Sequence, residues 1–137
     1  SADKQNVTLA SSAARSLMAA GRHDDAKNVL EQTLDKEWDA GLVQLYGECR
    51  SGDLIKQVEW ADAQLKQHSG DPDLLLALGK LCTELKLWGK AQNYLDASLA
   101  IQPKRETHLA ITNLLEKSGK PEEAARYNRK SFYSGNE

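Results

Sequence analysis

Three histidines and two cysteines are the side chains in this chain that could ligate a metal ion or a haem iron. His23, His68 and His108 are scattered far apart along the sequence, and none stands at zinc-ligand spacing from a cysteine. The sequence also holds no CxxCH haem-attachment motif, no HExxH motif and no glycine-rich phosphate loop. We therefore predict no metal site and no cofactor.

Adjacent carboxylates occur twice, at Asp24-Asp25 and at Glu122-Glu123, and such pairs can serve as general acid and base. Each pair, however, follows a glycine and stands where a helix is expected to begin. Negative charges there complement the positive end of the helix dipole. We interpret both pairs as helix-start charges and predict a protein that is not an enzyme.

Cys49 and Cys82 lie 33 residues apart, a distance close to one structural repeat of the kind described next. We interpret them as two equivalent buried packing residues in neighbouring repeats, since free cysteine is usually a small buried hydrophobe. A disulfide between neighbouring repeats is the alternative.

The stretch 72–103 carries the clearest pattern, with large apolar residues, small residues and a final proline at fixed offsets. It matches the tetratricopeptide repeat, a helix pair of about 34 residues with the pattern W-x2-L-G-x2-Y…A-x3-F…P. A small residue in each helix lets the two helices cross closely, which offsets the cost of a glycine inside a helix. The matching residues are Leu75, Leu78, Gly79, Cys82, Ala91, Leu95 and Pro103.

The 137 residues have room for about four such repeats, and stacked repeats bury the continuous core that one repeat cannot form alone. We predict an all-α fold: a right-handed tetratricopeptide-type superhelix of about four helix pairs. It forms a single domain over residues 1–137. The expected repeats cover about 4–37, 39–69, 72–103 and 104–134.

The second repeat is irregular. A short first helix is expected to break at Arg50-Ser51-Gly52, after which Asp53 caps a second helix. The apolar positions of these two helices do not fit one common register, which predicts a shifted turn. Trp60 lies one residue off the apolar stripe of the second helix, and we expect it to cover the second helix of the next repeat. An exposed contact surface is the alternative.

Charge and hydropathy exclude two kinds of partner. The chain has 18 basic and 20 acidic residues without a basic stripe, which argues against nucleic acid. No run approaches the roughly 20 apolar residues that span a bilayer. The partner that remains is another protein.

A stack of this kind offers a concave surface lined by the first helix of each repeat. The residues on these helices that point away from the core are the candidate contacts, and we expect a partner peptide or helix to bind between them through side-chain hydrogen bonds. The candidates are Arg15, Gln44, Glu48, Lys80, Thr83 and Asn113, with Ser11, Met18, Leu76, Leu109 and Glu116 on the same faces.

Repeat domains that bind acidic chaperone tails carry a clamp of paired lysine and asparagine on successive first helices. In this chain Ser11 stands where the first lysine belongs and Arg15 where its asparagine belongs. We therefore do not predict that this protein is a co-chaperone that binds acidic chaperone tails.

Two stretches resemble one family more specifically. Residues 71–82 (DPDLLLALGKLC) and 87–99 (LWGKAQNYLDASL) are similar to the C-terminal part of the HemY family, and 42–47 (LVQLYG) fits the preceding repeat of that family. HemY proteins are tetratricopeptide proteins of the proteobacterial inner membrane associated with haem (protohaem IX) biosynthesis. The resemblance covers about residues 39–134.

The resemblance implies a protein-interaction scaffold for late haem-pathway enzymes, or a regulator of them, and supplies no catalytic residue. It also implies an N-terminal membrane anchor before the repeats, so that the present chain would be a soluble fragment of an inner-membrane protein, on the cytoplasmic side. Two alternatives remain open: a direct haem or porphyrin carrier, and a general peptide-binding adaptor. Haem needs an axial ligand in a deep apolar pocket, and the sequence shows no histidine in one.

Overall fold

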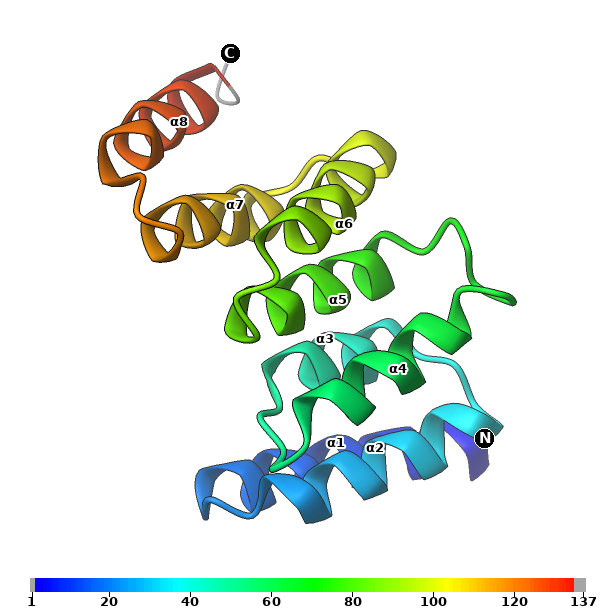
Figure 1. Cartoon of the computed structure of the whole chain (residues 1–137). Coiled ribbons are helices and arrows are strands. Elements are labelled where there is room, and N and C mark those ends of the chain that lie inside the picture. Colours follow the sequence, from blue (N-terminus) through cyan, green and yellow to red (C-terminus); the bar gives the residue numbers. More distant parts are fainter. Residues whose placement is uncertain (1, 135–137) are drawn as a thin grey trace.

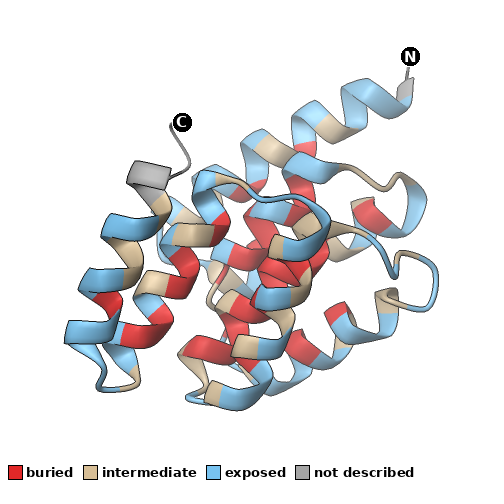
Figure 2. Cartoon of the chain, turned by 90° about the horizontal axis from the view of Figure 1, so that it is seen from above, coloured by how far each residue is buried: buried red, intermediate tan, exposed pale blue. Residues whose placement is uncertain are grey.

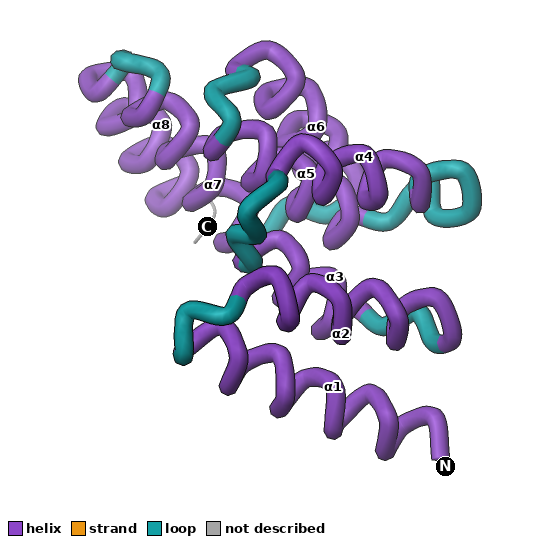
Figure 3. Tube along the Cα trace, turned by 60° about the horizontal axis from the view of Figure 1, so that its bottom comes forward, coloured by secondary structure: helices purple, strands orange, loops and turns teal. Residues whose placement is uncertain are grey.

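The computed structural model describes residues 2–134, which form a series of helices without a strand (Figure 1). Consecutive helices run antiparallel in pairs, and the pairs stack one after another along the chain (Figures 1 and 3). The eight helices of the described residues are α1 (Ala2–Ala19), α2 (His23–Lys36), α3 (Ala40–Glu48), α4 (Leu54–Gln64), α5 (Pro72–Glu84), α6 (Trp88–Ile101), α7 (Arg105–Lys117) and α8 (Pro121–Ser134).

Each first helix after α1 packs against both helices of the preceding pair: α3 contacts α1 and α2, α5 contacts α3 and α4, and α7 contacts α5 and α6. One hydrophobic cluster runs through the stack from Ala10 to Ala124, and the buried positions follow the facing sides of the helices (Figure 2). This is the all-α, tetratricopeptide-type arrangement that the sequence predicts.

The helix ends form where the sequence places them. Asp71 caps α5 by accepting from the backbone N–H groups of Asp73 and Leu74, with Pro72 as the first helical residue. α1 and α7 are followed by glycines in the left-handed conformation, Gly21 (φ 78°) and Gly119 (φ 84°). Glycine adopts this conformation without the steric penalty of a Cβ atom.

The third pair, α5 and α6, packs as closely as its pattern predicts. A Cβ atom on Gly79 would lie 2.3 Å from Cδ2 and 2.6 Å from Cγ of Leu95, which is fully buried. Ala91 supplies the second small residue of the crossing, with its carbonyl oxygen 3.5 Å from the same point. The glycine is therefore required by the approach of α6.

The second pair, α3 and α4, is built differently. The fourth residue of each second helix is a fully buried alanine in the other pairs, but in α4 it is Gln57, which is also fully buried. In this pair the small residue Gly47 allows close packing on the next repeat, because a Cβ atom on it would lie 2.9 Å from the Cα atom of Ala77 in α5. α3 therefore packs closely on α5, and the side chain of Gln57 fills the space between α3 and α4. The equivalent alanines are Ala26, Ala91 and Ala124.

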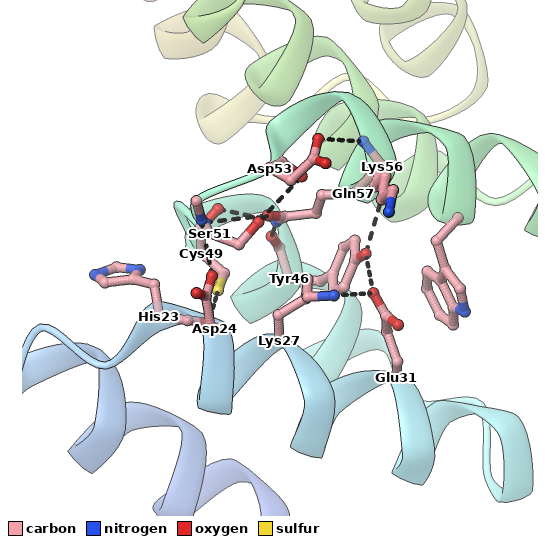
Figure 4. A network of polar contacts seen from close by, with 12 residues as sticks. His23, Asp24, Lys27, Glu31, Tyr46, Cys49, Ser51, Asp53, Lys56 and Gln57 are labelled. Atoms are coloured by element: carbon pink, nitrogen blue, oxygen red, sulfur yellow. Dashed lines mark hydrogen bonds and ion pairs between the residues drawn. The ribbon is translucent and has the colours of Figure 1, made fainter.

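The amide of Gln57 uses all of its hydrogen-bonding capacity (Figure 4). Its nitrogen donates to the carbonyl oxygens of Tyr46 (3.1 Å) and Cys49 (2.9 Å), at the end of α3. Its oxygen accepts from the backbone N–H (3.3 Å) and the hydroxyl (2.6 Å) of Ser51. Gln57 thereby adds a second hydrogen bond to each of these carbonyls, because Tyr46 O also accepts from the backbone N–H of Cys49 (3.2 Å) and Cys49 O from Nη1 of Arg50 (3.0 Å).

Tyr46 extends this network to the first pair. Its hydroxyl donates to the carboxylate of Glu31 in α2 at 2.6 Å and lies 3.2 Å from the carbonyl oxygen of Gln57. Burial, and then the hydrogen bond to Glu31, raise the pKa of Tyr46 far above its usual value. The ring of Trp60 packs against Tyr46 with centroids 4.9 Å apart. Trp60 therefore has a packing role, but its ring contact is with the first helix of its own pair and not with the second helix of the next repeat.

Both cysteines are free and buried, as the sequence predicts. The prediction that they occupy the same slot is wrong. Cys49 is the residue that follows α3, and Cys82 lies within α5, one residue further from the helix start. α3 and α5 align instead through Gly47 and Gly79, the eighth residue of each helix. The cysteines are 33 residues apart, but α3 and α5 are offset by only 32 residues (Ala40 to Pro72), so the two cysteines are not equivalent.

Candidate functional site

A groove runs along the face formed by the first helices. Its larger part has a volume of about 400 Å³ and is lined by residues of α1, α3, α5 and the start of α7. A second hollow of about 240 Å³ continues from it along α7. The two parts share Glu48, Lys80 and Glu106, so they form one continuous surface across the stack. We call this surface the concave groove.

The concave groove combines an apolar floor with charged walls. Leu45, Leu76 and Ala77 form the floor of the larger part, and Leu109 and Ala110 belong to the smaller part. Leu109 is an exposed large apolar side chain there. The charged residues that line the walls are Arg15, Glu48, Arg50, Asp73, Lys80, Lys104 and Glu106.

Five of the six residues proposed from the sequence lie in this groove. Arg15, Gln44, Glu48 and Lys80 line the larger part, and Lys80 and Glu48 also line the smaller part together with Asn113. They come from four different helices and face one surface.

Thr83 does not lie on this surface. Its side chain is 2% exposed, and its hydroxyl donates to the carbonyl oxygen of Gly79 at 2.8 Å. The position is one helical turn beyond Lys80, where the sequence pattern predicts an exposed face. In the structure this turn of α5 is covered, so Thr83 cannot contact a partner without a rearrangement.

Two lysines of the groove have carboxylate partners in neighbouring repeats. Lys80 in α5 forms an ion pair with Glu48 in α3. Lys104, which precedes α7, lies 2.6 Å from Asp73 in α5, and Gln44 in α3 donates to the same carboxylate at 3.1 Å. Lys80 and Lys104 are therefore charge-compensated, whereas Arg15 donates to the hydroxyl of Ser11 at 3.4 Å.

A further row of charges lies next to the groove. Glu84 at the end of α5 accepts from Lys117 in α7 at 2.7 Å and lies 4.0 Å from Arg50, which follows α3. The hydrogen bond from Lys117, and then the charge of Arg50, lower the pKa of Glu84 against the opposing effect of burial. These contacts join three consecutive repeats.

Sequence reasoning missed Asp73, Lys104 and Glu106 as groove residues. A signal was present, because the cross-repeat pairs stand at close to one repeat: Glu48 to Lys80 is 32 residues and Glu84 to Lys117 is 33. Opposite charges at the repeat spacing on first helices predict such contacts. A search for apolar and small slots alone does not detect them.

The residues that could ligate metal or haem are not gathered at a site. Between residues 2 and 134, no three His, Cys, Asp or Glu side chains are arranged to hold a metal ion. His23 Nδ1 accepts from the backbone N–H of Arg50 at 2.8 Å, and His68 stacks on Trp38 with ring centroids 3.8 Å apart. His108 Nδ1 lies 2.8 Å from the hydroxyl of Tyr127. Each histidine thus has a structural contact in a different part of the stack.

No protein-family model matches the chain, and no curated protein matches it. Among solved structures, the chain is similar to one titled "MamA D159K mutant 1", with 18% sequence identity and a TM-score of 0.37 over 97% of this chain and 99% of that one. None of the helices in the described part of the chain combines the length and the apolar character needed to cross a bilayer.

Proposed function

We propose that this protein is a non-enzymatic scaffold that binds a segment of another protein in the concave groove. The observation that carries the proposal is the continuity of the groove, which takes its lining from the first helices of all four pairs. An extended peptide or a helix is long enough to contact several repeats at once, whereas a small molecule would occupy only one hollow.

The lining of the groove supports a partner segment with both apolar and polar side chains. Leu45, Leu76 and Leu109 offer apolar contacts along its length. Because Lys80 and Asp73 already have partners of opposite charge, a bound segment must exchange with these ion pairs. Replacing these ion pairs by contacts to the partner favours specificity over affinity. The free energy needed to desolvate the charges offsets much of the free energy that the new contacts provide.

The experiment begins by capturing partners from a native membrane extract and then measures the affinity of the captured segment for variants. Arg15→Ala combined with Lys80→Ala should raise Kd by about tenfold or more, because a hydrogen bond to a charged group contributes roughly 1.5–3 kcal/mol. Lys90→Ala, an exposed position on the second helix α6, is the matched control and should leave Kd unchanged.

A charge exchange separates binding from stability. Glu48→Lys with Lys80→Glu keeps an ion pair between α3 and α5 but reverses its direction in the groove. The melting temperature should stay close to that of the parent chain while partner affinity falls. If both double variants bind as the parent does, the concave groove is not the binding surface and the proposal is wrong.

The choice of partner follows from the sequence resemblance to the HemY family over residues 39–134, and we propose late haem-pathway enzymes as the first candidates. An inner-membrane location for a longer form of the protein belongs to the same proposal. A haem or porphyrin carrier has less support, because none of the hollows of the concave groove is lined by a histidine. Titration with haem tests this alternative, and a ligated Soret band that is lost in a His→Ala variant would favour it.

A further inference from the structure

The turn that follows α3 is held against the first helix pair by contacts at the start of α2 (Figure 4). His23, the first residue of α2, accepts through Nδ1 from the backbone N–H of Arg50 at 2.8 Å. The thiol of Cys49 donates to the carbonyl oxygen of His23 at 3.2 Å. The neighbouring carboxylate of Asp24 accepts from the backbone N–H of Gly52 at 2.8 Å. We call these contacts the His23 joint.

The contact between His23 and Arg50 requires the neutral imidazole. A backbone N–H can only donate, so Nδ1 must present its lone pair, and a proton on Nδ1 removes this acceptor. Histidine is the side chain that ordinarily gains its proton between about pH 5 and pH 8. His23 is only partly buried, so a proton can reach the ring while the chain stays folded.

The charges on α2 itself make Asp24 the carboxylate that responds to this proton. Asp25 is already paired with Arg22 at 2.7 Å. An imidazolium attracts the carboxylate of Asp24 and so competes with the backbone N–H of Gly52 for it. Protonation of His23 therefore weakens two of the contacts that hold the turn.

The charges on neighbouring elements are engaged elsewhere. α2 packs on α1 and α3, and α1 carries no charged residue in its last turn. Asp53 caps α4 by accepting from the backbone N–H of Lys56. The ion pairs that hold the other charged side chains of α2, α3 and the end of α5 are Lys27–Glu31, Glu48–Lys80 and Lys117–Glu84.

Arg50 connects the His23 joint to the concave groove. Its Nη1 atom donates to the carbonyl oxygens of Gly47 (2.6 Å) and Cys49 (3.0 Å). Its Nε atom lies 4.0 Å from Glu84 in α5, and its side chain lines the smaller hollow of the groove. A change in the backbone at Arg50 therefore reaches the wall of that hollow.

We propose that the His23 joint is an acid-sensitive switch, which holds the turn and Arg50 in place at neutral pH and releases them when His23 is protonated. The folded chain binds the unprotonated ring, so folding and proton uptake compete. The stability that this contact provides is present above about pH 6.5 and is lost progressively as the pH falls below it. The switch needs no bound partner and stands apart from the proposed function.

An NMR titration of the full chain from about pH 8 to about pH 5.5 tests the switch, because carboxylates stay largely ionised in this range. The imidazole signals of His23 and the amide signal of Arg50 should change with one common midpoint. His23→Asn should abolish the change at Arg50, since the amide oxygen of Asn can accept the same N–H but does not titrate. His68→Asn is the matched control, because His68 stacks on Trp38 instead, and should leave the coupled change in place.

Thermal melting measures the consequence for stability. Over the same pH range, the Tm of the parent chain should fall by about 3 °C or more beyond the fall seen for His23→Asn. The titration of the parent chain decides the proposal even if the variant folds poorly. An Arg50 amide that does not follow the ionisation of His23 overturns the proposal. A pH dependence of Tm that His23→Asn retains in full overturns it as well.

Discussion

The second and third helix pairs occupy equivalent places in the stack but are held together by different interactions. In the third pair, Gly79 and Ala91 bring α5 and α6 into direct contact, and Leu95 fills the remaining space. In the second pair, α3 ends early and Gln57 takes the place of the alanine. The third pair depends on small residues that leave room for close helix contact. The second pair depends on an amide side chain whose donors and acceptors are all hydrogen-bonded.

The comparison shows how a helical repeat tolerates a defect. The early end of α3 leaves its last carbonyls without helical i+4 partners, so that Tyr46 O keeps only the N–H of Cys49 and Cys49 O only the side chain of Arg50. A buried polar group that loses its partner costs about 1–3 kcal/mol. Gln57 reaches those carbonyls from the next helix and holds the loop at Ser51 as well. The stack thus continues past the irregular repeat without losing its core.

The largest expected effect breaks the third pair. Gly79→Leu places a branched side chain where even one Cβ atom would lie 2.3 Å from Leu95. We expect destabilisation at or above the upper end of the roughly 1–3 kcal/mol range for overpacking, measured as a fall of about 10 °C or more in Tm. Gly89→Leu, in α6 with open space around it, is the control and should change Tm little. Equal melting of the two variants would show that α5 and α6 do not cross at Gly79.

The next effect breaks the second pair. Gln57→Leu keeps a similar volume but leaves the carbonyls of Tyr46 and Cys49 and the hydroxyl of Ser51 without the amide. We expect a loss of about 2 kcal/mol in the free energy of unfolding, because the backbone N–H of Ser51 loses its acceptor and each carbonyl loses one of its two hydrogen bonds. Denaturant unfolding measures it, with the exposed Gln67→Leu as control.

Gln57→Ala sharpens the same comparison, because it installs the residue that the other three pairs carry. If this slot were equivalent in all pairs, the alanine would be neutral or stabilising. We expect it to destabilise at least as much as the leucine variant, since it adds a cavity to the unpaired groups. A stabilised Gln57→Ala protein would contradict the role assigned to the amide.

The third pair could be predicted from the sequence in detail, whereas for the second pair only the short first helix, the break after it and the cap at Asp53 could be predicted. Close helix contact needs small residues at fixed offsets, and Gly79 and Ala91 display them directly in the sequence. Gln57 appears as an ordinary polar residue beside the apolar stripe of α4, because its partners are backbone carbonyls of a different helix. The sequence predicts that this helix breaks at Arg50-Ser51-Gly52, but it does not indicate which side chain then reaches the carbonyls at that end.

The concave groove could also be predicted only in part from the sequence. The side of the stack on which Arg15, Lys80 and Asn113 lie follows from helical periodicity alone. The burial of Thr83 and the ion pairs of Lys80 and Lys104 depend on how neighbouring pairs rotate against one another. That rotation is set by packing between repeats, which lies outside the pattern of any single repeat.

The smallest effect uses the two cysteines as reporters, since Cys49 belongs to the second pair and Cys82 to the third. Both are fully buried, so each thiol should react with iodoacetamide only when its own pair opens. Burial raises the pKa of Cys49 from 9.0 to about 11, so at pH 8 its native thiolate fraction is about 100-fold below that of an opened chain. Opening therefore increases both access and reactivity, and this advantage shrinks as pH rises toward 11.

In the parent chain both thiols should label slowly. Gln57→Leu should speed the labelling of Cys49 more than that of Cys82, because it loosens the contact between α3 and α4 while the α5–α6 crossing stays intact. Gly79→Leu should reverse the order. Mass spectrometry of digested protein, sampled over time in mild denaturant, gives both rates in one experiment. Identical rate changes at the two cysteines in both variants would mean that the pairs open as one cooperative unit. In that case the second and third pairs would differ in the interactions that stabilise them, but they would not unfold independently.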